Sequence, residues 1–283
     1  VPSRRAWPWF PRRGGTGMMG RALSATFVFV VYAFVYLPIA LVVLTAFNEA
    51  TITTLPIESY SLKWFKALFT NLRTLDALWT SIILGVLAAA SATVLGLFAA
   101  LAAMRHRFPG RRAFLALMAL PMVAPGIVLG VSLLLFWRTL GFKTGFTSLL
   151  LGHTLLALPY CTFIIMASLA RFDRTLEDAA RGLGATEPSV LLRIVLPNIM
   201  PGVLGALLFG FTISIGEFVV SFFLTSAGIT TLPIRIYSIV KVGITPEINA
   251  VSTLILAATI FLTLAAIRLT WSRGPKPSTG GSP

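Results

Sequence analysis

The chain has 283 residues, of which 57% are hydrophobic and 11% are charged, and its mean hydropathy is +0.89. This composition excludes a soluble globular enzyme, a disordered chain and a secreted disulfide scaffold. Six stretches lack Asp, Glu, Lys and Arg, and each reaches the roughly 20 residues that a helix needs to cross a membrane: residues 22–48, 77–104, 113–137, 144–170, 194–216 and 248–267. We therefore expect an all-α, polytopic membrane protein with six transmembrane helices.

The 23 Lys and Arg residues lie in the segments between these apolar stretches. Sixteen of them fall in the N-terminal tail, the second and fourth connections and the C-terminal end, whereas the other connections hold seven. Because short cytoplasmic segments carry the excess of Lys and Arg, both termini are predicted to be cytoplasmic. We expect cytoplasmic tails at residues 1–21 and 272–283 around a transmembrane domain of residues 22–271. The net charge of +14 thus comes from basic residues whose distribution indicates the orientation of the chain in a lipid bilayer. We expect no nucleic-acid partner.

The connection between the first two apolar stretches contains an amphipathic segment. Residues 61–70 place their large apolar side chains on one helical face, so we expect a short helix at the outer membrane interface. The second apolar stretch is rich in Ala, Gly and Ser over residues 88–103. Small residues let transmembrane helices approach closely, and this helix should therefore pack inside the bundle.

The third apolar stretch contains two prolines, Pro121 and Pro125, and Gly126 follows the second. A proline in a transmembrane helix frees backbone carbonyl groups, which a neighbouring helix or a water-lined cavity has to satisfy. A purely structural kink is one interpretation of this pattern. The other is that the kinked helix borders a solute pathway at Pro125 and Gly126.

Two ionisable side chains lie within the expected spans. His153, in the fourth, either bonds to a neighbouring helix or handles protons. Glu217 interrupts the fifth span, which we expect at about residues 203–226; an ionisable side chain at the centre of a span costs about 2.5 to 3.5 kcal/mol. We expect Glu217, with Ser221 one turn on, to line a translocation pathway and to favour a cationic or amine-bearing solute. The alternative is a hydrogen bond to a neighbouring helix, through His153 or a nearby hydroxyl group.

The sequence offers little for catalysis. It contains no phosphate-binding loop of the Gly-x-x-x-x-Gly-Lys-Ser/Thr type, no His-Glu-x-x-His helix and no Gly-x-Ser-x-Gly elbow. The single cysteine, Cys161, and two histidines can supply neither a disulfide within the chain nor a multi-thiolate metal site. We expect no catalytic residues, no metal and no cofactor bound by this chain.

The fourth connection is predicted to form two short helices. Thr175 with Asp178 three residues on fits a capping box, which starts a helix. Gly184 can take the left-handed conformation that ends this helix. A second helix follows, with Pro188 in its first turn and Pro197 limiting its continuation. Two short helices joined at a glycine have the shape of a docking element.

The same connection resembles a known motif. Asp178-Ala-Ala-x-x-x-Gly184, followed after nine residues by Ile194-x-Leu-Pro197, resembles the EAA loop of the membrane subunits of bacterial binding-protein-dependent ABC importers. The first position, usually Glu, is Asp178 here, and Glu177 directly precedes it. In that family the loop seats in a groove of the ATP-hydrolysing subunit and passes nucleotide-driven closure to the membrane helices. The resemblance therefore implies an ATPase-coupling loop at residues 171–200, with the coupling positions Asp178, Ala179, Ala180, Gly184, Ile194, Leu196 and Pro197.

The resemblance extends over nearly the whole chain. Residues 232–253 are similar to the last outer loop and the start of the sixth span in the second membrane subunit of spermidine/putrescine permeases. Two departures remove carboxylates from the pathway. Gly126 stands where such permeases often have Asp, and Gly216 with Glu217 stands where they have an Asp pair.

The resemblance implies a permease subunit with the fold of type I ABC importers, in the bacterial inner membrane. It would move a small solute, first of all a polyamine, from a periplasmic binding protein to the cytoplasm by alternating access. The implied partners are that binding protein, a second permease subunit and two ATP-binding subunits that hold ATP and Mg. Another small nitrogenous solute, such as an amino acid derivative or an aminophosphonate, stays open. A secondary transporter, a channel or a membrane-embedded enzyme is the alternative from a different class.

Overall fold

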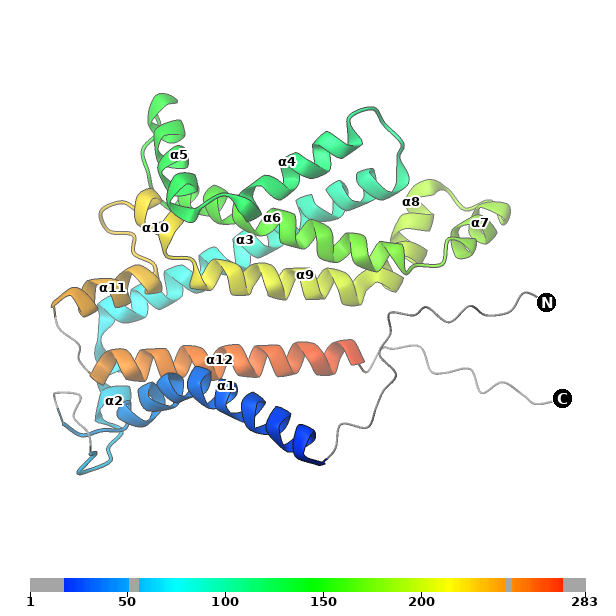
Figure 1. The fold of residues 1–283 in the computed structure, drawn as a ribbon. Coiled ribbons are helices and arrows are strands. Elements are labelled where there is room, and N and C mark those ends of the chain that lie inside the picture. Colours follow the sequence, from blue (N-terminus) through cyan, green and yellow to red (C-terminus); the bar gives the residue numbers. More distant parts are fainter. Residues whose placement is uncertain (1–17, 51–55, 243–245, 272–283) are drawn as a thin grey trace.

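The structure is a computed structural model that describes residues 18–50, 56–242 and 246–271, and these residues are nearly all helical (Figure 1). The elements in chain order are α1 (Met18–Thr45), α2 (Lys63–Thr70), α3 (Leu72–Arg105), α4 (Arg111–Val123), α5 (Gly126–Thr139), α6 (Phe146–Ala170), α7 (Thr175–Gly182), α8 (Glu187–Val190), the π-helical turn η1 (Leu191–Val195), α9 (Leu196–Gly216), α10 (Val219–Leu224), α11 (Leu232–Val242) and α12 (Pro246–Trp271).

Three long helices, α3, α6 and α9, lie side by side and form the centre of the molecule (Figure 1). Small side chains allow this close packing: Ala92 and Ala100 of α3, Ala157 and Cys161 of α6 and Ala206 of α9 are fully buried in one cluster. The prediction that the second apolar stretch packs inside the bundle is therefore confirmed.

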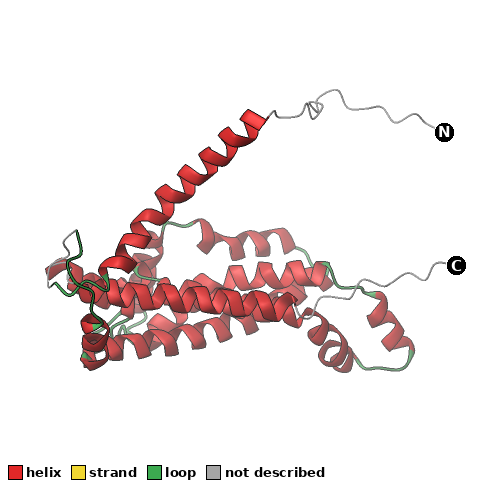
Figure 2. Cartoon of the chain, turned by 90° about the horizontal axis from the view of Figure 1, so that it is seen from below, coloured by secondary structure: helices red, strands yellow, loops and turns green. Residues whose placement is uncertain are grey.

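The first helix lies at the outside of this bundle. Figure 2 shows the helix next to the N-terminus diverging from the other helices, and the most apolar 18-residue window of its span Ala22–Thr45 contains no buried residue. It packs against α12, where Asn249 Nδ2 donates a hydrogen bond of 3.0 Å to Thr45 Oγ1. Most of the large apolar side chains of α1 are thus exposed on the surface of the bundle.

The number of membrane spans can be compared with the six that we expect. Among the described residues, four helices are long and apolar enough to cross a membrane, and the number rises to five if the bent pair α4 and α5 counts as one span. The described apolar part of α12, Pro246–Phe261, is shorter. A polytopic helical fold is confirmed, whereas a sixth full span stays a prediction.

The third expected span is broken rather than kinked. Helix α4 ends at Val123, α5 begins at Gly126, and the chain bends by 108° between them. Ala124 between them is extended, with φ −68° and ψ 134°. The ring of Pro125 disfavours the helical conformation at the residue before it, so this proline sets the position of the break.

The fifth expected span is also divided. Helix α9 ends at Gly216, Glu217 is extended with φ −78° and ψ 113°, and the short helix α10 begins at Val219. Glu217 therefore lies at a helix break, where the sequence predicted that it interrupts the span.

The sequence predicts that Pro197 limits the second helix of the coupling loop, but the structure shows no end there. The chain continues from α8 through η1 into α9, and the backbone N–H of Leu196 bonds to the carbonyl oxygen of Leu191, five residues back. Proline removes a donor and clashes with the carbonyl four residues before it. The wider π turn accommodates Pro197 within a continuous helix.

The two ends of the bundle carry different short helices. Helices α7 and α8 lie at one end, together with the start of α1 and the end of α12, while α2, α10 and α11 lie at the other (Figure 1). Helix α2 is the amphipathic helix predicted over residues 61–70. Its Trp64 Nε1 donates to the Asn48 carbonyl oxygen at 2.8 Å, and Leu68 is buried.

Candidate functional site

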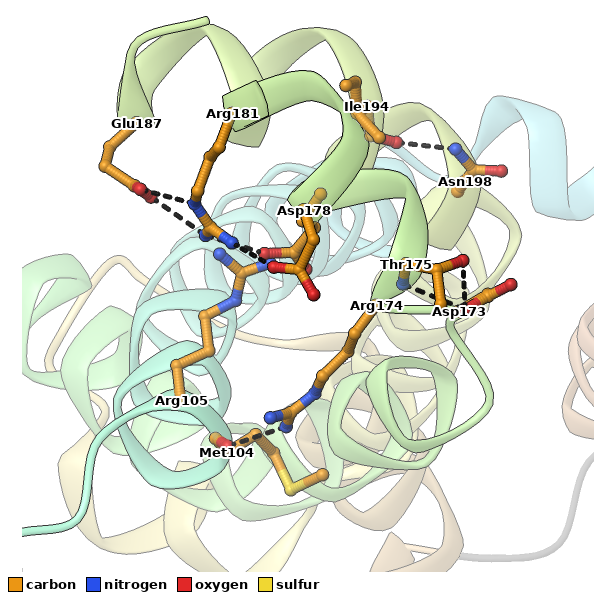
Figure 3. Close-up of polar contacts among 11 residues, drawn as sticks. Met104, Arg105, Asp173, Arg174, Thr175, Asp178, Arg181, Glu187, Ile194 and Asn198 are labelled. Carbon is orange, nitrogen blue, oxygen red and sulfur yellow. Dashed lines mark hydrogen bonds and ion pairs between the residues drawn. The ribbon is translucent and has the colours of Figure 1, made fainter. Parts of the chain in front are cut away.

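The first coupling helix, α7, begins with a cap that differs from the predicted one. Asp173 Oδ1 accepts the backbone N–H of Thr175 at 3.0 Å and its hydroxyl group at 2.8 Å (Figure 3). These hydrogen bonds, first the backbone one and then the hydroxyl one, lower the pKa of Asp173. The expected capping box of Thr175 with Asp178 is therefore wrong, because the capping carboxylate comes from two residues before Thr175.

The end of α7 follows the prediction. Gly184 has φ +86°, the left-handed conformation that a residue without a Cβ adopts readily. The N–H of Ala185 bonds to the Ala180 carbonyl at 3.0 Å, and the N–H of Gly184 bonds to the Arg181 carbonyl at 2.9 Å. This pair of bonds is a Schellman motif, and it turns the chain from α7 toward α8.

A buried carboxylate joins α7 to the central helix α3. Glu177 is 6% exposed, and its two oxygens accept Arg105 Nη2 at 2.5 Å and Arg181 Nη2 at 3.1 Å. Arg105 is the last residue of α3. A second contact links the same parts of the chain, since Arg174 Nη2 donates to the Met104 carbonyl oxygen at 3.1 Å (Figure 3).

Arg181 also connects the two coupling helices. Its Nε lies 2.6 Å from Glu187 Oε1 in α8, and its Nη1 lies 3.1 Å from Asp178 Oδ1 (Figure 3). The hydrogen bond to Glu187 raises the pKa of Arg181 above its usual range and lowers the pKa of Glu187. Arg181 therefore holds α7 and α8 in one arrangement across the Gly184 turn.

The predicted coupling positions lie together on this element, and they differ in exposure. The side chain of Asp178 is 75% exposed, and Ala179 is also exposed, whereas Ala180 is half-buried against the central cluster. Leu183, next to the turn, is 91% exposed. The outward surface around the turn is thus available to a partner. The remaining predicted positions lie on or after the turn: Gly184 and Pro197 are exposed, and Ile194 and Leu196 are half-buried.

The second candidate site lies at the opposite end of α9. Glu217 is half-buried, and its Oε1 accepts the backbone N–H of Val220 at 2.9 Å, so the carboxylate caps the start of α10. Its second oxygen, Oε2, has no hydrogen-bond partner among the residues that the structure describes. One oxygen is therefore structural, and the other is available to a ligand.

The other predicted pathway residues lie near this break. A Cβ on Gly126 would contact the side chain of Val219 at 3.6 Å, so the start of α5 adjoins the start of α10. Gly126 and the preceding Pro125 are exposed. Ser221 is fully buried, and its hydroxyl donates to the Glu217 carbonyl oxygen at 2.9 Å. We therefore assign Ser221 to the support of Glu217 and not to direct contact with a solute.

Aromatic rings gather beside the break. The ring centroids of Phe218 and Tyr237 lie 5.0 Å apart, and those of Phe222 and Tyr237 lie 6.1 Å apart. Lys241 Nζ lies over the Tyr237 ring, 4.9 Å from its centroid. An aromatic face attracts a cation through its negative quadrupole, so this cluster already accepts one ammonium group. The described residues contain no group of three or more His, Cys, Asp or Glu side chains suited to a metal ion.

Residues 92–272 match the family described as "Binding-protein-dependent transport system inner membrane component". The chain belongs to this family, and it is therefore a multi-pass permease component of an inner-membrane transport system. The coupling loop and both helix breaks lie within the matched residues.

Curated relatives agree with this assignment. The chain is 38% identical over 248 residues to the "Spermidine/putrescine transport system permease protein PotC" of Haemophilus influenzae, covering 88% of this chain and 96% of that protein. It is 34% identical over 234 residues to the "Putrescine transport system permease protein PotI" of Escherichia coli K12, covering 80% and 83%. A "Putative 2-aminoethylphosphonate transport system permease protein PhnV" of Salmonella typhimurium is 25% identical, over 95% of this chain and 99% of that protein.

Solved structures share the fold. A chain of a bacterial ABC transporter involved in the import of the acidic polysaccharide alginate matches with a TM-score of 0.65 at 14% identity, covering 95% of this chain and 100% of that chain. A chain of the inward-facing MetNI methionine ABC transporter matches with a TM-score of 0.58 at 17% identity, covering 74% and 99%. These likenesses confirm the fold of ABC importer permeases.

Sequence reasoning missed the residues that hold the coupling loop together. In the sequence, Glu177 is only the neighbour of Asp178, and Arg105 is only one of several basic residues in its connection. The spacing of Glu177 and Arg181, four residues apart on one helix face, is the signal that could have identified their pair. Nothing in the sequence indicates that Arg105, 72 residues before Glu177, bonds to the same carboxylate.

Proposed function

We propose that this chain is one of two permease subunits in an ATP-driven importer that takes a polyamine from a periplasmic binding protein. Two ATP-binding subunits, which bind ATP and Mg, would dock at the cytoplasmic end formed by α7 and α8. The single observation that carries this proposal is the coupling element at that end, formed by α7 and α8. It is joined to α3 by an ion pair and to α9 by the continuous chain. The likeness to polyamine permeases over 88% of the chain supports the choice of substrate.

The coupling element can pass a movement to the bundle in two ways. Glu177 bonds to Arg105 at the end of α3, and α8 continues without a break through η1 into α9. Docking of an ATPase against the exposed surface around Leu183 would therefore act on both helices. The start of α3 and the end of α9 lie at the opposite end of the bundle, where Glu217 and α10 are also found (Figure 1).

The second site has the chemistry that an amine-bearing solute requires. Glu217 offers one carboxylate oxygen, and Phe218, Phe222 and Tyr237 offer aromatic faces close to the same break. A carboxylate bonds strongly to an ammonium group, and aromatic faces add a cation–π attraction. We propose that the solute passes Glu217, whose charge favours di- and tri-cations over neutral or anionic solutes.

Uptake by the complete transporter tests this function. The chain, its partner permease, the ATPase and the binding protein would be reconstituted in proteoliposomes and supplied with labelled spermidine, putrescine or 2-aminoethylphosphonate. We expect uptake of the two polyamines. Glu217→Gln should lower it about tenfold, or about 1.4 kcal/mol, with basal ATP hydrolysis unchanged.

The exposed Glu58 supplies the matched control, since Glu58→Gln removes the same charge outside the spans and should leave uptake unchanged. Import of 2-aminoethylphosphonate in place of polyamines would assign the chain to the other solute class. Normal polyamine uptake in Glu217→Gln would show that this carboxylate does not select the solute.

A further inference from the structure

His153 of α6 lies inside the bundle and bridges the two sides of the α9–α10 break. Its side chain is 1% exposed, and both ring nitrogens are hydrogen-bonded. Nδ1 lies 2.7 Å from Ser214 Oγ, in the last turn of α9, and Nε2 lies 2.8 Å from Ser221 Oγ, in α10. One rigid ring on a third helix therefore fixes the distance between the helices on either side of Glu217.

The hydrogen-bond directions can be assigned from the donors available. Ser221 has a single hydroxyl hydrogen, which it donates to the Glu217 carbonyl oxygen. Its oxygen must therefore accept the hydrogen of His153 Nε2, and in the neutral ring Nδ1 accepts the hydroxyl hydrogen of Ser214. The result is one directed chain that runs from Ser214 through His153 and Ser221 to the backbone of Glu217.

The same short helix holds the Glu217 side chain. The backbone N–H of Val220 donates to Glu217 Oε1, so Glu217 is bound by α10 at its carbonyl group and at its carboxylate group. Both bonds are local and tie Glu217 to the start of α10, so Glu217 moves with that helix. His153 sets the position of α10 through Ser221, without touching the carboxylate itself.

The close approach of α6 to α10 brings His153 within reach of Ser221. Gly152 precedes it, and a Cβ at this position would lie 2.6 Å from Leu224 Cδ1 and 3.0 Å from Val220 Cγ1. A side chain here would displace those of Leu224 and Val220, so a glycine permits the close contact between the helices. Gly152 and His153 together form the support beneath the break.

We propose that His153 is a positioning residue for the pathway carboxylate: it holds the α9–α10 break so that Glu217 presents its second oxygen toward the solute. The part that concerns the solute rests on the proposed function. The part that concerns the position of the break depends only on the hydrogen bonds described above, and the two parts are tested separately.

A labelling experiment tests the position of the break. In a Cys161→Ala background, Glu217→Cys in the complete transporter would be reacted with a membrane-impermeant methanethiosulfonate reagent. We expect His153→Leu to change the reaction rate at least threefold and His153→Gln, which can donate and accept hydrogen bonds, to keep it within twofold. Thr162→Val is the control, because it removes a buried hydroxyl of the same helix that bonds to Leu158 at 2.8 Å. An unchanged rate in His153→Leu would overturn the proposal.

A double-mutant cycle on polyamine uptake tests whether His153 acts through Glu217. His153→Leu should lower uptake about tenfold when Glu217 is present and less than twofold in the Glu217→Gln background. Full additivity would contradict a positioning role, because a general structural defect adds to the loss of the charge. If Glu217→Gln alone leaves uptake normal, the proposed pathway role fails, and the labelling rates still decide whether His153 holds the break.

Discussion

Arg105 donates to Glu177 at 2.5 Å, and this ion pair joins the last residue of α3 to the first turn of α7. The side chains are 21% and 8% exposed, so water screens the pair weakly. A central helix of the bundle is therefore bonded directly to the coupling element, in addition to the continuous connection from α8 into α9.

Breaking this ion pair should loosen the coupling element. Arg105→Met removes one of the two arginines on Glu177 and should cost about 1.5 to 3 kcal/mol, because a buried carboxylate loses a charged hydrogen bond. Glu177→Gln should cost a similar amount. The double variant should cost less than the sum of the two single substitutions. Thermal unfolding of the purified complex would measure the loss of stability, and ATPase stimulation by the binding protein would measure the loss of coupling. Simple additivity of the two effects would argue against a direct pair.

The turn at Gly184 and the nearby Gly182 form a matched pair for substitution. Gly184→Ala should destabilise the loop by about 1 to 2 kcal/mol, because a Cβ disfavours the left-handed conformation, and it should weaken ATPase docking. Gly182 lies in α7, without a positive φ and with open space around its Cα. Gly182→Ala should be neutral or slightly stabilising, as judged by the yield of the ATPase complex. Equal effects of both substitutions would contradict the role of the turn.

The coupling loop should lose order in acid. The pKa values of Asp173 and Glu187 are lowered by their hydrogen bonds to Thr175 and Arg181. A group with a lower pKa in the folded state stabilises that state above its unfolded pKa, about 4 for these carboxyl groups, and this stabilisation is lost as the pH falls through the folded value. A spin label at Leu183→Cys, in the Cys161→Ala background, should show constant mobility from about pH 8 to 5 and higher mobility below about pH 4.

Glu187→Gln provides the comparison for this pH dependence. It removes one of the two titrating carboxylates, so the label should already be more mobile at neutral pH and should change less in acid. An identical pH profile in Glu187→Gln and the parent would show that this carboxylate does not contribute to the order of the loop.

The orientation in the membrane rests on the distribution of the basic residues. A reporter that is active only outside the cytoplasm should be silent when fused after Pro283 and active when inserted near Thr54. The reason is that Lys and Arg in short connections are retained in the cytoplasm. The position near Thr54 lies outside the described residues, so the fusion supplies independent information. An active fusion after Pro283 would exclude the six-span topology.

The fold was largely predictable because the membrane imposes strong rules on sequence. Uncharged stretches located the long helices, and the glycine of the coupling loop located its turn. The breaks at Pro125 and Glu217 were less predictable. A proline or a carboxylate indicates that a helix is perturbed. The angle of the bend depends on packing between distant parts of the chain, such as α5 against α10, and no local sequence pattern indicates that packing.

The candidate sites were predictable to different extents. The coupling loop was recognised from its spacing, and its residues do lie together at one end of the bundle. Its internal bonds were not foreseen, because Arg105 and Glu177 meet only in the folded chain. Of the two interpretations of His153, bonding to a neighbouring helix or proton handling, the structure shows the first. Its two partners, Ser214 and Ser221, lie 61 and 68 residues away.

The uninterrupted helical path from α8 through η1 to the end of α9 has the shape of a lever. Its 30 residues, Glu187–Gly216, measure about 45 Å at about 1.5 Å per residue, so a tilt of about 10° around the middle displaces each end by about 4 Å in opposite directions. Glu217 follows directly after the last residue of this lever. A small movement of the α8 end, where the ATPase is proposed to dock, would thus produce a displacement of similar size at the break, without a hinge in between.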